Sequence, residues 1–111
     1  MAFVKVTQTG NPVTILQVPW DKIFEIDGMY IYNGSSSTAT VTIMDSYTYS
    51  LGASAGTSSG RTIIETKIPA NSGLNLSKLQ GEEIIGELVV VTDQQPIDVY
   101  VGVREKGGYG R

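Results

Sequence analysis

The chain of 111 residues contains no cysteine and no histidine. The lack of cysteine excludes disulfide cross-links and thiolate nucleophiles, and the lack of both residues removes the common zinc ligands. Without histidine there is no serine nucleophile activated by an imidazole. No other general base tuned near neutral pH is evident from the sequence. We therefore expect a protein that is not an enzyme and that needs no cofactor and no metal.

Charge is scarce as well. Charged residues make up 17% of the chain, against about 25% in typical globular proteins. Hydrophobic residues make up 41%, which argues against disorder. The formal net charge of −3 disfavours electrostatic binding to nucleic acid or to an anionic membrane. A surface with few charges leaves more area that can contact another subunit.

Long apolar runs are also missing, since none approaches the roughly 18 residues that a membrane-spanning helix needs. The first residues, Met1 to Val6, alternate in polarity and lack the basic and then apolar pattern of a secretory signal peptide. We expect a protein made in the cytoplasm and not secreted through a signal peptide. The length fits one domain over residues 1–111 and is too short for two.

What is present is period-two alternation along almost the whole chain, which is typical of β-strands. Glycine, proline and Asn-Gly or Asp-Gly pairs separate the alternating segments. The pattern predicts an all-β fold, an antiparallel β-sandwich or jelly-roll-like domain of about eight short strands. The candidate strands are Phe3–Thr7, Val13–Val18, Lys22–Ile26, Met29–Tyr32, Ala39–Met44, Thr62–Ile68, Gly73–Leu76, Ile84–Thr92 and Ile97–Arg104.

Four segments depart from simple alternation. The predicted strand over 84–92 is apolar on both faces, which suggests that another layer or subunit covers it. Residues 52–60 are only Gly, Ala, Ser and Thr, a composition that predicts a flexible loop. Residues 105–111 form a short C-terminal tail, and the segment 77–83 is the only helical candidate, with a single turn at best.

Three possible sites have weak support in the sequence. Residues 56–62 resemble a phosphate loop, but the spacing is wrong and a strand follows. Glu25 with Asp27, and Glu82 with Glu83, are carboxylate pairs, which solvated strand faces and turns explain better than catalysis. Calcium ligands remain a further alternative, but no loop has the dense oxygen spacing that calcium requires. The carboxylates considered for calcium are Asp21, Glu25, Asp27 and Asp45.

The aromatic residues are the candidate interface. Tyr30 and Tyr32 share one strand face opposite Met29 and Ile31, and Tyr100 projects away from the apolar face of its own strand. Such tyrosines suit a protein interface or a sugar-stacking platform, or they form ordinary cross-strand pairs. Trp20 fits either a sheet end or a contact. The full candidate set is Trp20, Tyr30, Tyr32, Tyr47, Tyr49, Tyr100 and Tyr109.

Several stretches of the chain resemble small β-sandwich virion proteins, particularly accessory or decoration subunits of tailed-phage-like heads. The resemblance lies in the stretches 30–34, 40–45, 68–73 and 99–102. It implies a non-catalytic structural protein that forms a symmetric homo-oligomer, with a trimer favoured. It also implies that the protein reinforces a capsid or shell and resides in the virion after synthesis in the host cytoplasm. No site residue follows from the resemblance.

Two functions remain open from the sequence. The first is self-association and decoration or reinforcement of a viral or phage capsid-like shell, with the protein itself and a capsid or shell protein as partners. The second is a carbohydrate- or surface-ligand-binding β-sandwich module, with Tyr47, Tyr49 and the loop 52–60 at one end of the sandwich.

Overall fold

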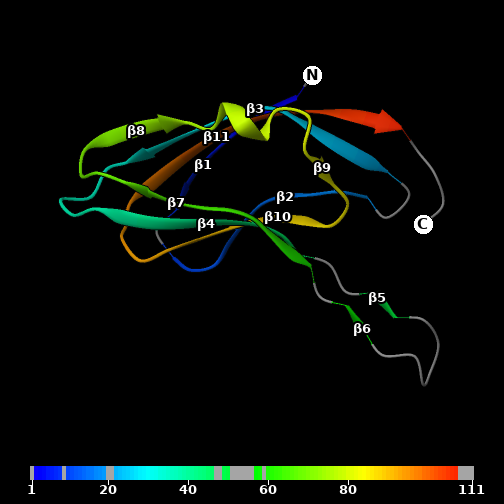
Figure 1. Cartoon of the computed structure of the whole chain (residues 1–111), viewed down its shortest axis with the longest axis horizontal. Coiled ribbons are helices and arrows are strands. Elements are labelled where there is room, and N and C mark those ends of the chain that lie inside the picture. The colour runs from blue at the N-terminus through cyan, green and yellow to red at the C-terminus, as the bar shows by residue number, and fades with distance from the viewer. Residues whose placement is uncertain are drawn as a thin grey trace.

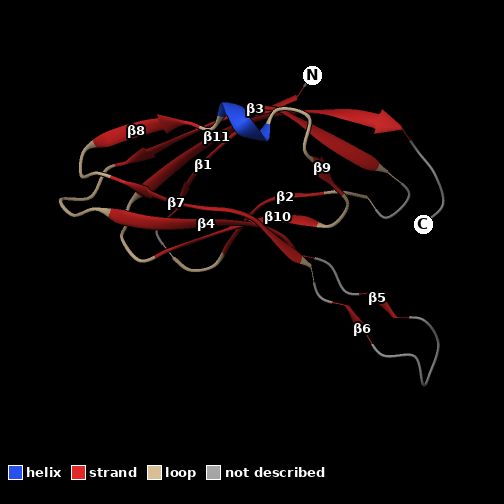
Figure 2. Ribbon diagram, in the orientation of Figure 1, coloured by secondary structure: helices blue, strands red, loops and turns tan. Residues whose placement is uncertain are grey.

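The computed structural model describes residues 2–8, 10–19, 22–46, 49–50, 57–58 and 60–107. Strands account for nearly all of the regular structure, and the only helix in these ranges is the 3-10 turn η1 (Figure 2). The strands are β1 (Ala2–Gln8), β2 (Val13–Gln17), β3 (Ile23–Asn33), β4 (Ala39–Ser46), β5 (Tyr49–Ser50), β6 (Thr57–Ser58), β7 (Arg61–Ile68), β8 (Ser72–Asn75), β9 (Glu83–Ile84), β10 (Glu87–Thr92) and β11 (Ile97–Gly107), and η1 spans Ser77–Leu79.

Two antiparallel sheets pack face to face, as predicted (Figure 1). One sheet, here called sheet A, has the order β1-β11-β3-β8, with β9 also paired to β3. The other, sheet B, has the order β2-β10-β4-β7. All pairings in both sheets are antiparallel. The prediction of an antiparallel β-sandwich is therefore confirmed.

The strand order is that of a jelly roll. In chain order the eight main strands pair first with last, second with seventh, third with sixth and fourth with fifth, namely β1 with β11, β2 with β10, β3 with β8 and β4 with β7. These four pairs make one long hairpin, which is rolled up so that β3 pairs with β11 and β4 with β10. Such rolling produces the two Greek keys of an eight-stranded jelly roll.

The closed end of this long hairpin lies between β4 and β7. There β5 and β6 pair with each other, Tyr49 opposite Ser58 and Ser50 opposite Thr57, and belong to neither sheet. Figure 1 shows this two-stranded ribbon beyond the end of the sandwich. Residues 57–58 are thus strand within the predicted loop 52–60.

The core lies between the sheets because one side of each strand is apolar. In β4 the alternation of buried and half-buried residues is complete, with Val41 and Ile43 buried and Thr40 and Thr42 partly exposed. Burying each such side chain stabilises the fold by about 1.5–3 kcal/mol. The fully buried apolar residues with exposure below 2% are Ile26, Ile31, Ala39, Val41, Ile43, Ile68, Ile84, Leu88, Val90, Ile97, Val99, Val101 and Val103.

The structure corrects the two predicted strands 22–26 and 29–32, which are one continuous strand, β3. Gly28 lies opposite Gly102 and Ile26 opposite Val103, so Asp27 is the extra residue of a β-bulge. The bulge lets both Ile26 and Met29 face the core, where they are 0% and 2% exposed. The bulge interrupts strict alternation, and the Asp27-Gly28 pair resembles a turn in the sequence. The predicted break between two strands at this point is therefore wrong.

The predicted strand 84–92 is also wrong as a single element. Its first residue, Ile84, belongs to β9 in sheet A, whereas residues 87–92 form β10 in sheet B. The buried carboxylate of Asp45 accepts hydrogen bonds from the backbone amides of Ile85 and Gly86 at 3.1 and 2.9 Å. Asp45 therefore satisfies the two amides at the point where the chain leaves one sheet for the other.

The C-terminal strand is longer than predicted. β11 extends to Gly107, so residues 105–107 of the predicted tail are strand, and 108–111 lie outside the described residues.

Candidate functional site

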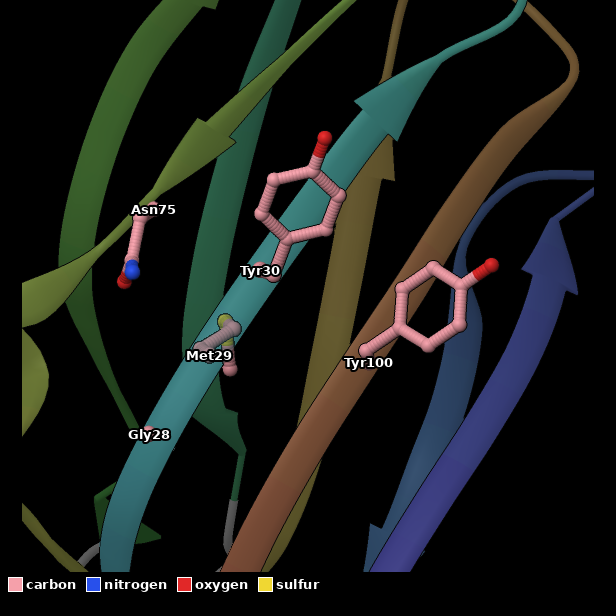
Figure 3. Close-up of a pocket in the computed structure, with 5 residues that line it drawn as sticks. All are labelled: Gly28, Met29, Tyr30, Asn75 and Tyr100. Atoms are coloured by element: carbon pink, nitrogen blue, oxygen red, sulfur yellow. The ribbon is translucent and has the colours of Figure 1, made fainter.

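The outer face of sheet A carries a row of side chains that crosses four strands. Tyr30 of β3 lies between Asn75 of β8 and Tyr100 of β11, and Tyr100 lies opposite Lys5 of β1. Figure 3 shows Asn75 and Tyr100 on opposite sides of β3. We call these four residues the aromatic row. Tyr30 is 40% exposed and is the one exposed large hydrophobic residue in the described part of the chain.

The two tyrosines of this row contact each other. Their ring centroids are 5.9 Å apart and the ring planes are tilted by 53°, a geometry favoured by aromatic pairs. The Lys5 ammonium lies 5.6 Å from the centroid of the Tyr100 ring, within cation–π range. Neither tyrosine hydroxyl nor the Asn75 amide has a hydrogen-bond partner among the described residues. These polar groups are therefore available to a ligand.

Beside the aromatic row, Gly28 of β3 lies opposite Gly102 of β11, and this pair, here called the glycine gap, places no side chain on either of the two strands. A Cβ atom added at Gly28 would meet no atom within 4 Å. The gap opens into a hollow of about 200 Å³ lined by Gly28, Met29, Tyr30, Asn75 and Tyr100. In Figure 3 both tyrosine hydroxyls point away from Gly28, so the rings rather than the hydroxyls border the hollow.

A third glycine determines the position of the Tyr30 ring. A Cβ atom at Gly73 of β8 would lie 1.8 Å from the Tyr30 hydroxyl, so the ring leans over a strand position that lacks a side chain. Any residue other than glycine at position 73 would displace the ring. Gly73 therefore positions Tyr30 at the edge of the hollow.

On the other side of the glycine gap is a group of ion pairs, here called the ion-pair row. Arg104 of β11 lies opposite Glu25 of β3, with its Nε 3.0 Å from the Glu25 Oε1 and 3.3 Å from the Asp27 Oδ1. Lys106 forms an ion pair with Glu83 of β9 and lies 3.8 Å from Glu25. The row thus ties together β3, β9 and β11.

These contacts stabilise the charged forms of the partners. The hydrogen bond from Arg104 holds the pKa of Glu25 below its usual value of 4.5, with the charge of the Arg104 guanidinium adding to the effect against partial desolvation. The same hydrogen bond raises the pKa of Arg104, and Asp27 raises it further. The hydrogen bond to Glu83 raises the pKa of Lys106. All three groups therefore stay ionised at neutral pH.

No protein-family model matches the chain, and comparisons with curated proteins and with solved structures find no similar protein.

The structure gathers three of the seven predicted interface residues. Tyr30, Tyr32 and Tyr100 lie on the same outer face, with Tyr32 opposite Asp98 in the row next to the aromatic row. Tyr49 is the first residue of β5, where only the backbone is described. The remaining candidates, Trp20, Tyr47 and Tyr109, lie outside the described residues.

Sequence reasoning missed Lys5, Gly28, Gly73 and Asn75. One signal was available, because Gly28, Tyr30 and Tyr32 alternate and so share a strand face, as do Tyr100 and Gly102. Asn75 and Lys5 have no such signal, since only the register of β8 and β1 brings them beside the tyrosines.

The carboxylates considered for catalysis or for calcium binding lie apart from one another or form ion pairs with arginine or lysine side chains. Asp45 is buried on β4, and Asp21 is outside the described residues. Glu25 and Asp27 contact Arg104, whereas Glu82 contacts Arg61. In the described ranges no three His, Cys, Asp or Glu side chains are grouped so that they could hold a metal ion. Those ranges also contain no helix with the length and apolar character to cross a membrane.

Proposed function

We propose that this chain is a non-catalytic structural protein that associates with copies of itself and decorates or reinforces a capsid-like shell in a virion. The partners are a second copy of the chain, in a symmetric oligomer for which a trimer is expected, and a shell protein.

The observation that carries the proposal is the ribbon of β5 and β6. It continues from β4 and β7 but pairs with neither sheet, and it extends beyond the sandwich (Figure 1). An isolated two-stranded hairpin has marginal stability in water and needs a further layer to pack on. Tyr47 precedes the ribbon in sequence and Tyr49 is its first residue, and tyrosine is enriched in protein interfaces. A neighbouring subunit supplies the missing layer.

The topology supports the same proposal by analogy. Eight-stranded jelly rolls occur in viral capsid proteins, lectins and cupins. Fold analogy alone does not assign a function, so the ribbon has to be tested directly.

The test replaces residues 47–59 by Asn-Gly, which joins Ser46 to Gly60. Asp45 and Arg61 already pair across β4 and β7, and Asn-Gly is a favoured two-residue hairpin turn. We expect the sandwich to keep its β circular dichroism. Sedimentation velocity should show a discrete oligomer for the original chain and a monomer for the variant, with the association constant reduced at least about tenfold, or about 1.4 kcal/mol.

A matched pair of tyrosine variants locates the contact. Tyr49→Ser should weaken association, whereas Tyr32→Ser, in the body of sheet A, should not. A monomeric original chain at millimolar concentration, or an oligomer unaffected by loss of the ribbon, would contradict self-association through this element.

The shell assignment has its own experiment. Particles from the source of this chain would be separated on a density gradient, and the chain would be detected by mass spectrometry across the fractions. We expect it to sediment with intact shells and to be released as oligomers. Its absence from every particle fraction would refute the shell assignment while leaving self-association standing.

A further inference from the structure

We propose that the hollow between the aromatic row and the ion-pair row binds one ring of a neutral saccharide. This function is separate from self-association, because residues of sheet A line the hollow, whereas the ribbon extends from the end of β4 and β7 (Figure 1).

The shape of the hollow suits a single ring. Sites for drug-sized ligands usually enclose about 300–1,000 Å³, whereas this hollow is about 200 Å³. Its floor is the strand backbone at Gly28, with open space where a Cβ atom would be. A stable protein partner would cover about 800 Å² of this chain, far more than a hollow lined by five residues.

The chemistry of the walls matches a sugar ring, which has an apolar C–H face and hydroxyls around its edge. The Tyr30 and Tyr100 rings offer apolar aromatic surface on one side (Figure 3). The Asn75 amide, which offers both donors and an acceptor, has no partner in the described part of the chain. Glu25, Asp27 and Arg104 lie beyond the glycine gap and are not among the residues that line the hollow.

The charge of the site favours a neutral ligand. The ion-pair row holds three carboxylates, on Glu25, Asp27 and Glu83, against the two cations of Arg104 and Lys106. Its formal charge is therefore −1, which Lys5 of the aromatic row offsets to zero over the two rows, and the cations of the ion-pair row are already paired. An acidic sugar would have to compete with these carboxylates for the same cations, whereas hydroxyls can add to the network without breaking it.

Gly28→Val tests the proposal without threatening the fold. The space above Gly28 is empty, and valine favours strands more than glycine does, so the variant should fold while its side chain fills the hollow. Gly10→Val is the matched control, because Gly10 is equally unobstructed and lies outside the hollow.

The measurement starts with a printed array of neutral and acidic glycans and continues with calorimetric titration of the best free oligosaccharide. We expect a reproducible neutral hit, an association constant at least tenfold lower for Gly28→Val and for Tyr100→Ala, and no change for Gly10→Val. Gly73→Ala should also weaken binding severalfold, because the added methyl displaces the Tyr30 ring. The ribbon-replaced variant should bind like the original chain.

Three results would overturn the proposal. A flat array would exclude a saccharide ligand, and hits restricted to sialylated or sulfated glycans would exclude a neutral one. If Gly28→Val left glycan binding intact, the glycan would bind elsewhere on the chain. Loss of the oligomer in Gly28→Val with no glycan hit would instead assign the hollow to a contact between copies.

Discussion

Two glycines on the outer face of sheet A shape the hollow because they have no side chain. Gly28 leaves the floor of the hollow open, and Gly73 leaves room for the Tyr30 ring. In a strand interior glycine weakens the sheet, and it often marks a place where a ligand or another group approaches the backbone closely. The Tyr30 ring occupies the space beside Gly73, which explains why glycine is present there. Gly28 faces open space, so packing does not explain why this position is glycine.

The side chain of Asp45 holds the segment between β9 and β10, where the chain passes from sheet A to sheet B. Its side chain is 1% exposed and satisfies the amides of Ile85 and Gly86. Asp45→Ala would leave both donors without this acceptor, at a cost of at most about 1–3 kcal/mol for each amide, since Ile85 and Gly86 are half-buried. We expect a total loss of about 2–4 kcal/mol in the free energy of unfolding, measured by urea denaturation.

Asp45→Asn is the control for this prediction. The amide keeps one oxygen that can accept a hydrogen bond, so it should lose less than Asp45→Ala. Equal and small losses in both variants would show that water satisfies the two amides.

At the scale of elements, the ion-pair row joins β3 to β9 and β11 and makes their pairing depend on pH. Because Arg104 lowers the pKa of Glu25 in the folded chain, folding is favoured wherever Glu25 is ionised. This stabilisation is fully present above pH 4.5 and is lost as the pH falls through the lower pKa of the folded state.

The prediction compares Glu25→Gln with the original chain in urea at several pH values. We expect a lower urea midpoint for Glu25→Gln at pH 7, and a difference that shrinks as the pH falls below 4. Glu65→Gln, on an exposed position of β7, is the matched control. A difference that persisted unchanged at pH 2.5 would show that Glu25 acts through packing and not through its charge.

Among the strands, the alternation of polar and apolar residues predicts an element correctly where neither a bulge nor a change of sheet interrupts it. Residues 39–46 alternate without interruption, and β4 was predicted closely. The prediction failed at Asp27 and at Ile85-Gly86, where a bulge and a change of sheet break the period. The bulge is defined by pairing with Gly102 and Val103, and the change of sheet is held by Asp45. These residues are distant in the sequence, so the local pattern contains no signal for either irregularity.

For the whole molecule, the jelly roll brings the two ends of the described chain together. Ala2 of β1 lies opposite Val103 of β11, while the closed end of the rolled hairpin lies between β4 and β7. A circular permutant that joins the ends by a short Gly-Ser linker and opens at residue 53 keeps every pairing within the two sheets. We expect it to fold with a loss of no more than about 2 kcal/mol, since the closure cost changes slowly with loop length.

Circular dichroism and urea unfolding measure whether the permutant folds and how much stability it loses. Opening the ribbon should also weaken self-association, which sedimentation velocity measures. A permutant that fails to fold, while one opened at Gly10 folds, would show that the ribbon is needed for the sandwich itself.

The sequence by itself determined the all-β class, the two-sheet sandwich and the outward direction of Tyr30, Tyr32 and Tyr100, because strand periodicity is a local property that each segment carries alone. Only the tertiary structure decided the strand order, the bulge at Asp27 and the row that joins Asn75 and Lys5 to the tyrosines. Register between distant strands depends on which faces become buried together, and that choice is made by the packing of the whole chain.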